Sequence, residues 1–329
     1  MSLETTDYNL SLIDKFMEEF ERRRSIIASF IRNRGRVSFR DFVWANLYHP
    51  DAGYYVKGDV EIMSSEPYDD FEVGKIRHAA IKCAVEDMFE SGEVITLNYL
   101  GDEKKIRKGF EGVVVADEYF TSLPFHIVKN RKKVCVEYDG DFKEVLDELD
   151  DLEEFLDYAQ PYIKANSFAV CTDAVKKAEE IASKIEEGYM LVIDYGLPVE
   201  EYYTRKLRLA CFSRGSFSHN PYTSAGKRAI SAPVDFTAII EAAEREEMVV
   251  TGFTSYRYFL LNTIGKDESE EPSSFKSIAM PVTLKVLVMQ KGIRWRKLKC
   301  LQSVPTFGYW IKYNKNLDFR DFSDGLSYG

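Results

Sequence analysis

Gly112-Val113-Val114-Val115-Ala116-Asp117-Glu118 and Gly188-Tyr189-Met190-Leu191-Val192-Ile193-Asp194-Tyr195-Gly196 are the two stretches that decide the fold. Each is a short apolar run that stops abruptly at carboxylates, which is typical of a buried parallel strand. Ligands of open α/β sheets bind outside the carboxyl ends of such strands. We therefore expect Asp117, Glu118 and Asp194 to share one functional edge of a sheet.

The rest of the chain alternates helical and strand patterns around these two runs. Helices are expected at 8–33, 37–48, 76–89, 172–187, 236–247 and 256–264, and further strands at 94–97, 134–138, 282–289 and 309–313. The stretch 139–157 holds ten carboxylates and one lysine among apolar residues, and it is predicted to form a solvated helix. The alternation predicts an α/β fold with a helical N-terminal region packed on the sheet.

The connection between the strands at 94–97 and 113–116 is short. Residues 101–109 can hold one short crossover helix, but they cannot hold two complete βα units. We therefore predict a reduced sheet, with at least one βα unit fewer than a complete doubly wound α/β sheet.

Composition narrows the classes of function. A net charge of −10 and a pI near 5.2 argue against a nucleic-acid-binding surface and favour a partner with a basic segment. No stretch approaches the roughly 18 apolar residues of a membrane span, so no membrane insertion is expected. The scattered cysteines and histidines predict no metal site, and the acidic N-terminus without a signal-peptide core predicts a cytoplasmic location.

Five segments, in order, resemble the MidA-like methyltransferases. These S-adenosylmethionine-dependent enzymes include the mitochondrial complex I assembly arginine methyltransferase. The segments are 47–55 (LYHPDAGYY), 58–66 (GDVEIMSSE), 117–126 (DEYFTSLPFH), 192–196 (VIDYG) and 226–236 (GKRAISAPVDF). The resemblance covers about residues 35 to 290. It implies a Rossmann-like methyltransferase sheet at 93–290, a helical N-terminal region at 1–92 and a C-terminal extension with added strands at 291–329.

The resemblance also implies roles for individual residues. Two carboxylates would be catalytic, and other residues would contact S-adenosylmethionine or line the cleft for a protein substrate. The catalytic pair is Glu118 and Asp194; the cofactor contacts are Gly58, Asp59 and Asp117; the substrate cleft is formed by Tyr54, Tyr55, Tyr195 and Asp235. Glu118 and Asp194 could bind a guanidinium through bidentate hydrogen bonds. Taken alone, Asp117-Glu118 would also fit a helix N-terminus, and Tyr54-Tyr55 would fit ordinary packing.

The departures from the family pattern leave two functions open. The family's glycine-rich "ELGPGxG" run, which lets backbone approach the cofactor, corresponds here to 94–102 (VITLNYLGD), with one glycine. Family aspartates are replaced by Thr121 and Ala229, and the Tyr99 ring could fill the adenosine side of the pocket. The chain is therefore expected either to methylate a protein arginine or to be a catalytically inactive assembly factor or scaffold.

Overall fold

The structure is a computed structural model of the chain. It describes residues 3–57, 71–89, 92–97, 99, 102–150, 152–213, 216–223, 225–264 and 283–301, with no description of the side chains of 3–16, 71–73 and 216.

One mixed sheet forms the centre of the fold. Its strand order is β13-β14-β8-β3-β2, and the short β12 lies beside the end of β8. The strands are β2 (Glu93–Leu97), β3 (Phe110–Asp117), β8 (Ile185–Leu197), β12 (Val234–Asp235), β13 (Val249–Ser255) and β14 (Leu284–Lys291). β2, β3 and β8 are parallel, whereas β14 runs antiparallel between β8 and β13. The two runs that decided the fold are therefore adjacent parallel strands, as predicted.

Two glycines explain how closely these strands pair. Gly112 and Gly188 are partners across β3 and β8, with φ of +148° and +153°. A Cβ atom on Gly112 would lie 2.0 Å from the Glu93 carbonyl oxygen, and one on Gly188 would lie 1.9 Å from that of Gly112. Any other residue at these positions would therefore push the three parallel strands apart at their start.

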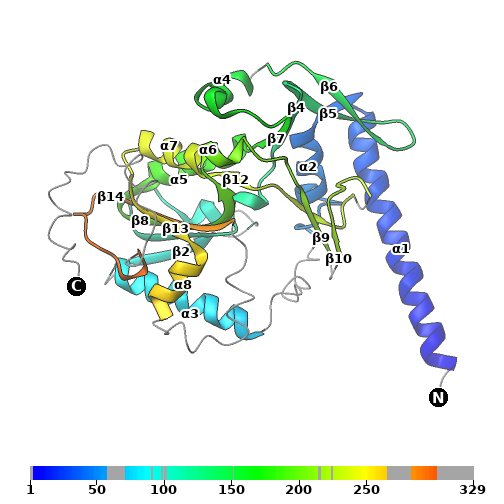
Figure 1. The fold of residues 1–329 in the computed structure, drawn as a ribbon. Helices are drawn as coiled ribbons and strands as arrows, with labels where there is room; N and C mark the ends of the chain where they lie inside the picture. Colours follow the sequence, from blue (N-terminus) through cyan, green and yellow to red (C-terminus); the bar gives the residue numbers. More distant parts are fainter. Residues whose placement is uncertain are drawn as a thin grey trace.

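Helices cover both faces of this sheet, as Figure 1 shows. α5 (Thr172–Lys184) and α7 (Phe236–Arg245) pack on the face that carries Val114 and Val192. α3 (Phe71–Met88) and α8 (Tyr256–Ile264) pack on the opposite face, which carries Val113 and Leu191. Successive strand residues point to opposite faces, so an apolar run with helices on both sides can be buried completely.

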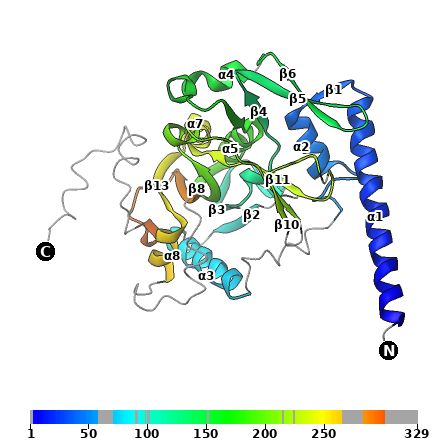
Figure 2. The same ribbon diagram turned by 45° about the vertical axis from the view of Figure 1, so that its right-hand side comes forward.

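The N-terminal region packs against two smaller sheets. It contains α1 (Leu3–Arg32), β1 (Arg36–Ser38) and α2 (Phe39–Tyr48). One small sheet has the order β1-β5-β4-β7, with β6 beside β5; the other has the order β10-β9-β11. Their strands are β4 (His126–Lys129), β5 (Lys132–Tyr138), β6 (Phe142–Asp147), β7 (Ser167–Val170), β9 (Ala210–Ser213), β10 (Ser216–Ser218) and β11 (Ala229–Ser231). Figures 1 and 2 show α1 along the outside of the molecule, with its N-terminal half extending away from it.

Short helical turns complete the described chain. They are α4 (Leu152–Leu156), α6 (Val199–Tyr202) and the 3₁₀ turns η2 (Asp102–Lys105), η3 (Phe120–Ser122), η4 (Asp157–Tyr162) and η6 (Lys299–Leu301). Among the described residues, η2 is the one element between β2 and β3, and the central sheet has six strands with β2 at its edge. The prediction of a reduced α/β sheet with a helical N-terminal region is thus confirmed.

One sequence prediction was wrong. The acidic stretch 139–157 is not a single helix, because it forms β6 followed by the short α4 and the start of η4. Its carboxylates pair across strands with basic residues: Lys129 with Glu144, and Lys132 with Glu148 at 2.9 Å. These cross-strand pairs favour a sheet over a helix here. The strand expected at 309–313 lies outside the described residues, and the predicted domain limits stay a prediction.

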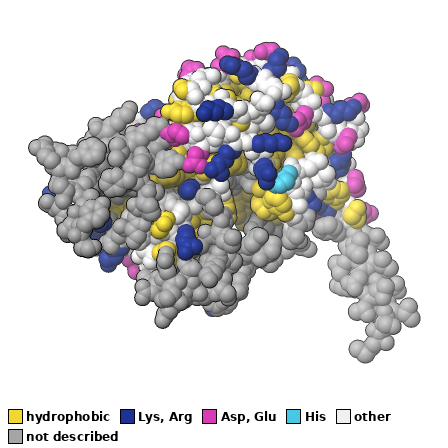
Figure 3. Space-filling view, in the orientation of Figure 1, with side chains coloured by type: hydrophobic (Ala, Val, Ile, Leu, Met, Phe, Trp, Pro, Cys, Tyr) yellow, Lys and Arg dark blue, Asp and Glu magenta, His cyan; other side chains and the backbone are white. Residues whose placement is uncertain are grey.

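The described surface carries charges of both signs. Figure 3 shows basic and acidic side chains interspersed on the face seen there. None of the described helices is both long enough and apolar enough to cross a membrane. The described part of the chain also contains no group of three or more His, Cys, Asp or Glu side chains that could hold a metal ion.

Candidate functional site

The carboxyl ends of β3 and β8 meet at one edge of the central sheet. The chain leaves β3 at Asp117, and the backbone amide of Glu118 donates to the carbonyl oxygen of Ile193 in β8 at 2.8 Å. Glu118 adopts a left-handed conformation with φ of +50°. Such a conformation costs a non-glycine residue on the order of 1–3 kcal/mol and is found in tight turns and at functional sites. The turn therefore holds the Glu118 side chain at the sheet edge against a local strain.

Arg77 of α3 binds both carboxylates at the end of β3. Its Nε and Nη2 donate to the two oxygens of Asp117, with Nε at 3.1 Å, and its Nη1 donates to Glu118 at 2.7 Å. The three side chains are 23%, 23% and 41% exposed, so the cluster is partly shielded from water. Burial alone would lower the pKa of Arg77, but the charges of Glu118 and Asp117 raise it well above its ordinary range. The guanidinium is thus permanently charged and held in a fork geometry.

Arg77 is the site residue that sequence reasoning missed. It lies in the helix expected at 76–89, on the same helical face as Ala80, Ala84 and Met88, which are buried. The spacing 77, 80, 84, 88 matches one side of a helix. A cation on an otherwise apolar face needs a buried partner, and that signal could have pointed to Asp117 and Glu118.

Asp194 lies completely inside the protein at the end of β8. Its exposed fraction is 0%, and its two oxygens accept four hydrogen bonds. The donors are the amides of Phe120 (2.8 Å), Thr121 (3.2 Å) and Tyr195 (2.8 Å) and the hydroxyl of Thr121 (2.6 Å). Burial raises the pKa of Asp194 to about 7, against the lowering effect of the Thr121 hydroxyl. This geometry fixes the η3 turn, and it leaves no free oxygen for a guanidinium.

Four tyrosines form a wall beside Glu118. The ring centroid of Tyr55 lies 4.5 Å from that of Tyr99 in a stacked arrangement, and 5.5 and 5.6 Å from those of Tyr48 and Tyr54. Tyr54 and Tyr55 are buried. Burial raises the pKa of Tyr55, and the neighbouring tyrosines and the Glu118 carboxylate raise it further. The wall therefore adjoins the sheet edge, and Tyr99 enters it from the turn that follows β2.

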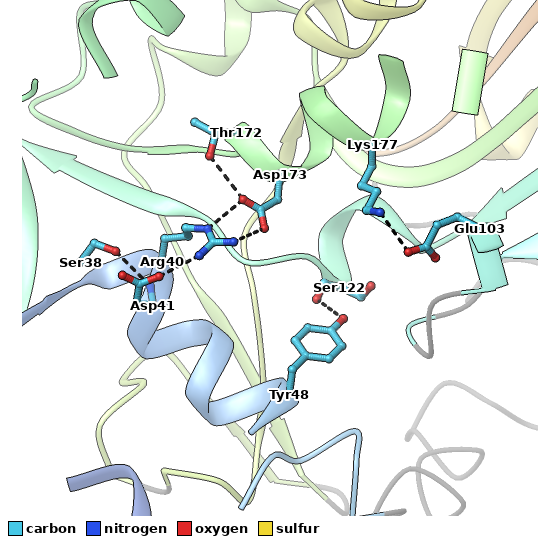
Figure 4. A network of polar contacts seen from close by, with 9 residues as sticks. All are labelled: Ser38, Arg40, Asp41, Tyr48, Glu103, Ser122, Thr172, Asp173 and Lys177. Atoms are coloured by element: carbon cyan, nitrogen blue, oxygen red, sulfur yellow. Dashed lines mark hydrogen bonds and ion pairs between the residues drawn. The ribbon is translucent and has the colours of Figure 1, made fainter. Parts of the chain in front are cut away.

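Polar contacts attach α2 to this edge, as Figure 4 shows. The Tyr48 hydroxyl donates to the carbonyl oxygen of Ser122 in η3 at 2.9 Å. At the other end of α2, Arg40 binds Asp173 of α5 through two hydrogen bonds of 2.9 and 2.8 Å. The Ser38 hydroxyl accepts from the amide of Asp41 at 3.1 Å and caps the helix. The C-terminal end of α2 is therefore fixed to η3, which follows β3, and its N-terminal end is fixed to α5.

The predicted site residues fall into three groups. Asp117, Glu118, Asp194, Tyr54 and Tyr55 come together at the sheet edge, and Tyr195 follows Asp194 in β8. Asp235 instead caps α7 and lines a cleft between α5 and α7, which Glu118 and the tyrosine wall do not line. Gly58 and Asp59 lie outside the described residues.

Comparisons with known proteins identify the family and the fold of the chain. Residues 87–254, just over half of the chain, match a family described as "Putative S-adenosyl-L-methionine-dependent methyltransferase". The crystal structure of an uncharacterised protein from Burkholderia thailandensis is similar, with a TM-score of 0.72 and 20% identity over 87% of this chain and 96% of that one. A second crystal structure, of a member of the same superfamily from that organism bound to S-adenosyl-homocysteine, is also similar. Its TM-score is 0.69 and its sequence identity is 19%, over 86% of this chain and 95% of that one.

At these identities the two crystal structures establish the Rossmann-like fold, and the family match covers the sheet edge with Asp117, Glu118 and Asp194. No curated protein matches the chain. The chain belongs to the MidA-like family of S-adenosylmethionine-dependent methyltransferases.

Proposed function

We propose that this chain is a catalytically inactive member of its family that uses the fold to bind a partner protein. The observation that carries the proposal is the Arg77 ion pair. A substrate guanidinium would need Asp117 or Glu118, and both already bind an arginine of the same chain. Hydrogen bonds to charged groups contribute about 1.5–3 kcal/mol each, so an incoming arginine would first have to displace Arg77 at a comparable cost.

The described residues also fit the cofactor poorly. In a dinucleotide-type fold the turn after the first strand is rich in glycine, because backbone must approach the ligand there. Here that turn follows β2 and carries Tyr99, whose ring stacks on Tyr55. β2 is also the edge of the sheet within the described chain, so no neighbouring strand there offers an acid to the ribose hydroxyls. Binding of S-adenosylmethionine is therefore expected to be weak or absent.

The partner in this proposal is a protein with a basic segment. A chain with a net charge of −10 attracts cationic surfaces and repels nucleic acid. A cytoplasmic location belongs to the same proposal. Binding to such a partner should weaken as the salt concentration rises, because exposed charges are screened within about 10 Å at 0.1 M salt.

Methylation of a protein arginine is the second candidate. Its support is the match of residues 87–254 to a methyltransferase family and a bound S-adenosyl-homocysteine in a structure of similar fold. In that case Glu118 would orient the guanidinium after Arg77 moves away, and Asp194 would hold the turn that carries it. Methyl transfer from a sulfonium needs mainly an in-line approach and exclusion of water.

Isothermal titration calorimetry with S-adenosylmethionine and S-adenosyl-homocysteine separates the two candidates. If the protein is an inactive scaffold, the dissociation constant of either ligand for the wild-type protein should exceed about 1 mM. Micromolar affinity would refute it. Incubation with methyl-labelled S-adenosylmethionine and a basic, arginine-containing peptide supplies a second readout, and label on the peptide would establish the enzyme. Cooperative thermal unfolding of the same sample controls for a folded protein.

A further inference from the structure

A cleft of about 590 Å³ lies between α5 and α7, away from the tyrosine wall. Apolar side chains of both helices line it, among them Val175 and Ile239. The lining also includes a polar cluster, called the polar end below: the Tyr158 hydroxyl donates to Asp235, and the phenol oxygens of Tyr158 and Tyr203 lie 3.3 Å apart. Its volume falls within the range of small-molecule sites, which are mostly apolar with a few convergent polar groups.

The polar end contains a buried carboxylate that has no cationic partner. Asp235 is 6% exposed, and it accepts hydrogen bonds from the amides of Thr237 (2.9 Å) and Ala238 (3.4 Å) and from the hydroxyl of Tyr158. All of these donors are neutral, and among the described residues Asp235 forms no ion pair. Buried charges are normally paired, and the N-terminus of α7 offsets only about half a unit charge.

The surroundings of Asp235 also favour a positive ligand. Five carboxylates and two cations line the cleft: Glu154, Asp157, Glu179, Asp235 and Glu241, against Lys176 and Arg245. Arg245 is already paired with Glu179 at 3.3 Å, and Lys176 lies over the Phe155 ring. Burial raises the pKa of Tyr158 far above its usual value, and the charge of Asp235 raises it further. Carboxylates therefore outnumber cations around the cleft, and the buried one among them is Asp235.

We propose that this cleft binds a compact organic cation of the alkylammonium type. The ammonium group would lie at the polar end, close to Asp235 and the phenol oxygens of Tyr158 and Tyr203, and the apolar body would contact Val175 and Ile239. A guanidinium fits less well, because Oδ1 of Asp235 already accepts two amide hydrogen bonds and Oδ2 accepts one, which leaves a place on Oδ2 for a single donor but not for a two-bond fork. The site does not depend on whether the protein transfers methyl groups.

Calorimetry with a matched pair of probes tests the proposal. 4-Phenylbutylamine carries the charge, and 4-phenylbutan-1-ol has the same apolar body without it. We expect the amine to bind at least tenfold more tightly than the alcohol. Equal affinities, or no heat from either probe, would overturn the proposal. A second titration uses the peptide acetyl-Leu-Lys-Leu-amide. If the peptide binds more tightly than 4-phenylbutylamine, the natural cation is the lysine of a partner protein. If the peptide binds more weakly, the natural cation is a free amine.

Variants localise the binding to the cleft. Asp235→Asn keeps a side chain that caps helices well and removes the charge, so amine affinity should fall about tenfold while alcohol affinity stays the same. Asp139→Asn makes the same chemical change at an exposed position and should alter neither. If Asp235→Asn does not fold, Val175→Phe narrows the apolar end instead, and both probes should then lose affinity. Unchanged amine binding in a folded variant would refute the site.

Discussion

The buried carboxylate of Asp194 should make the stability of this protein depend on pH. The pKa of Asp194 rises from an ordinary 3.8 to about 7 in the folded protein, chiefly through burial. A raised carboxyl pKa means that the folded state binds the proton more tightly than the unfolded state. Its contribution to stability is therefore complete below about pH 4 and is lost as the pH rises through 7.

The magnitude follows from that shift. One pKa unit corresponds to about 1.4 kcal/mol, and linkage between the two pKa values gives roughly 2–3 kcal/mol of stability lost between pH 5 and pH 8. The group is completely buried, so solvent screening does not reduce this figure. Replacement of Asp194 by Asn removes the titration. It also leaves one acceptor oxygen for four donors, which lowers stability at every pH by on the order of 2–6 kcal/mol.

Urea denaturation of the wild type and of Asp194→Asn, repeated from pH 5 to pH 8, measures the effect. The wild type should have the larger free energy of unfolding at both pH 5 and pH 8. The difference between the two proteins should decrease by roughly 2–3 kcal/mol as the pH rises. Other titrating groups, including Asp235 with a pKa raised to about 6, cancel in this difference. Asp139→Asn, at an exposed position, should show no such change. A gap that stays constant across the range would refute the buried, charge-sensitive role of Asp194.

Three further predictions concern the sheet edge and its supports. Arg77→Gln should lower the free energy of unfolding by about 2 kcal/mol in urea denaturation, because two carboxylates lose their cation, and Arg77→Lys should recover part of this loss. Tyr99→Gly should increase calorimetric affinity for S-adenosyl-homocysteine at least tenfold, and an unchanged affinity would show that the ring is not the obstruction. Arg40 and Asp173 should show a coupling energy of about 1 kcal/mol in a double-mutant cycle, a value kept low because both side chains are partly exposed.

The sequence predicted the central sheet well because its signals are local. The apolar runs that end at Asp117 and Asp194 are short, rich in β-branched residues and preceded by glycine, which favours buried strands, and the short link before β3 limits how many strands can precede it. The stretch 139–157 was mispredicted because its charges are neutralised by residues on another strand, such as Lys132. A helical pattern of apolar residues cannot reveal a cross-strand partner. The same limit applies to Arg77, whose two partners lie about 40 positions away along the chain.

The partners of the carboxylates also decide how experiments at this edge can be interpreted. Asp194 holds η3 in place, and Asp117 and Glu118 hold α3, so all three have structural roles that do not require a ligand. Such residues can be retained after catalysis is lost, because changing them would destabilise the fold even in a protein that binds no cofactor. Loss of activity in a variant of Asp194 or Glu118 would therefore not identify a catalytic residue. The informative change is a gain of cofactor binding when Tyr99 is replaced, because loss of a stacked side chain that has only a structural role is expected to weaken binding rather than strengthen it.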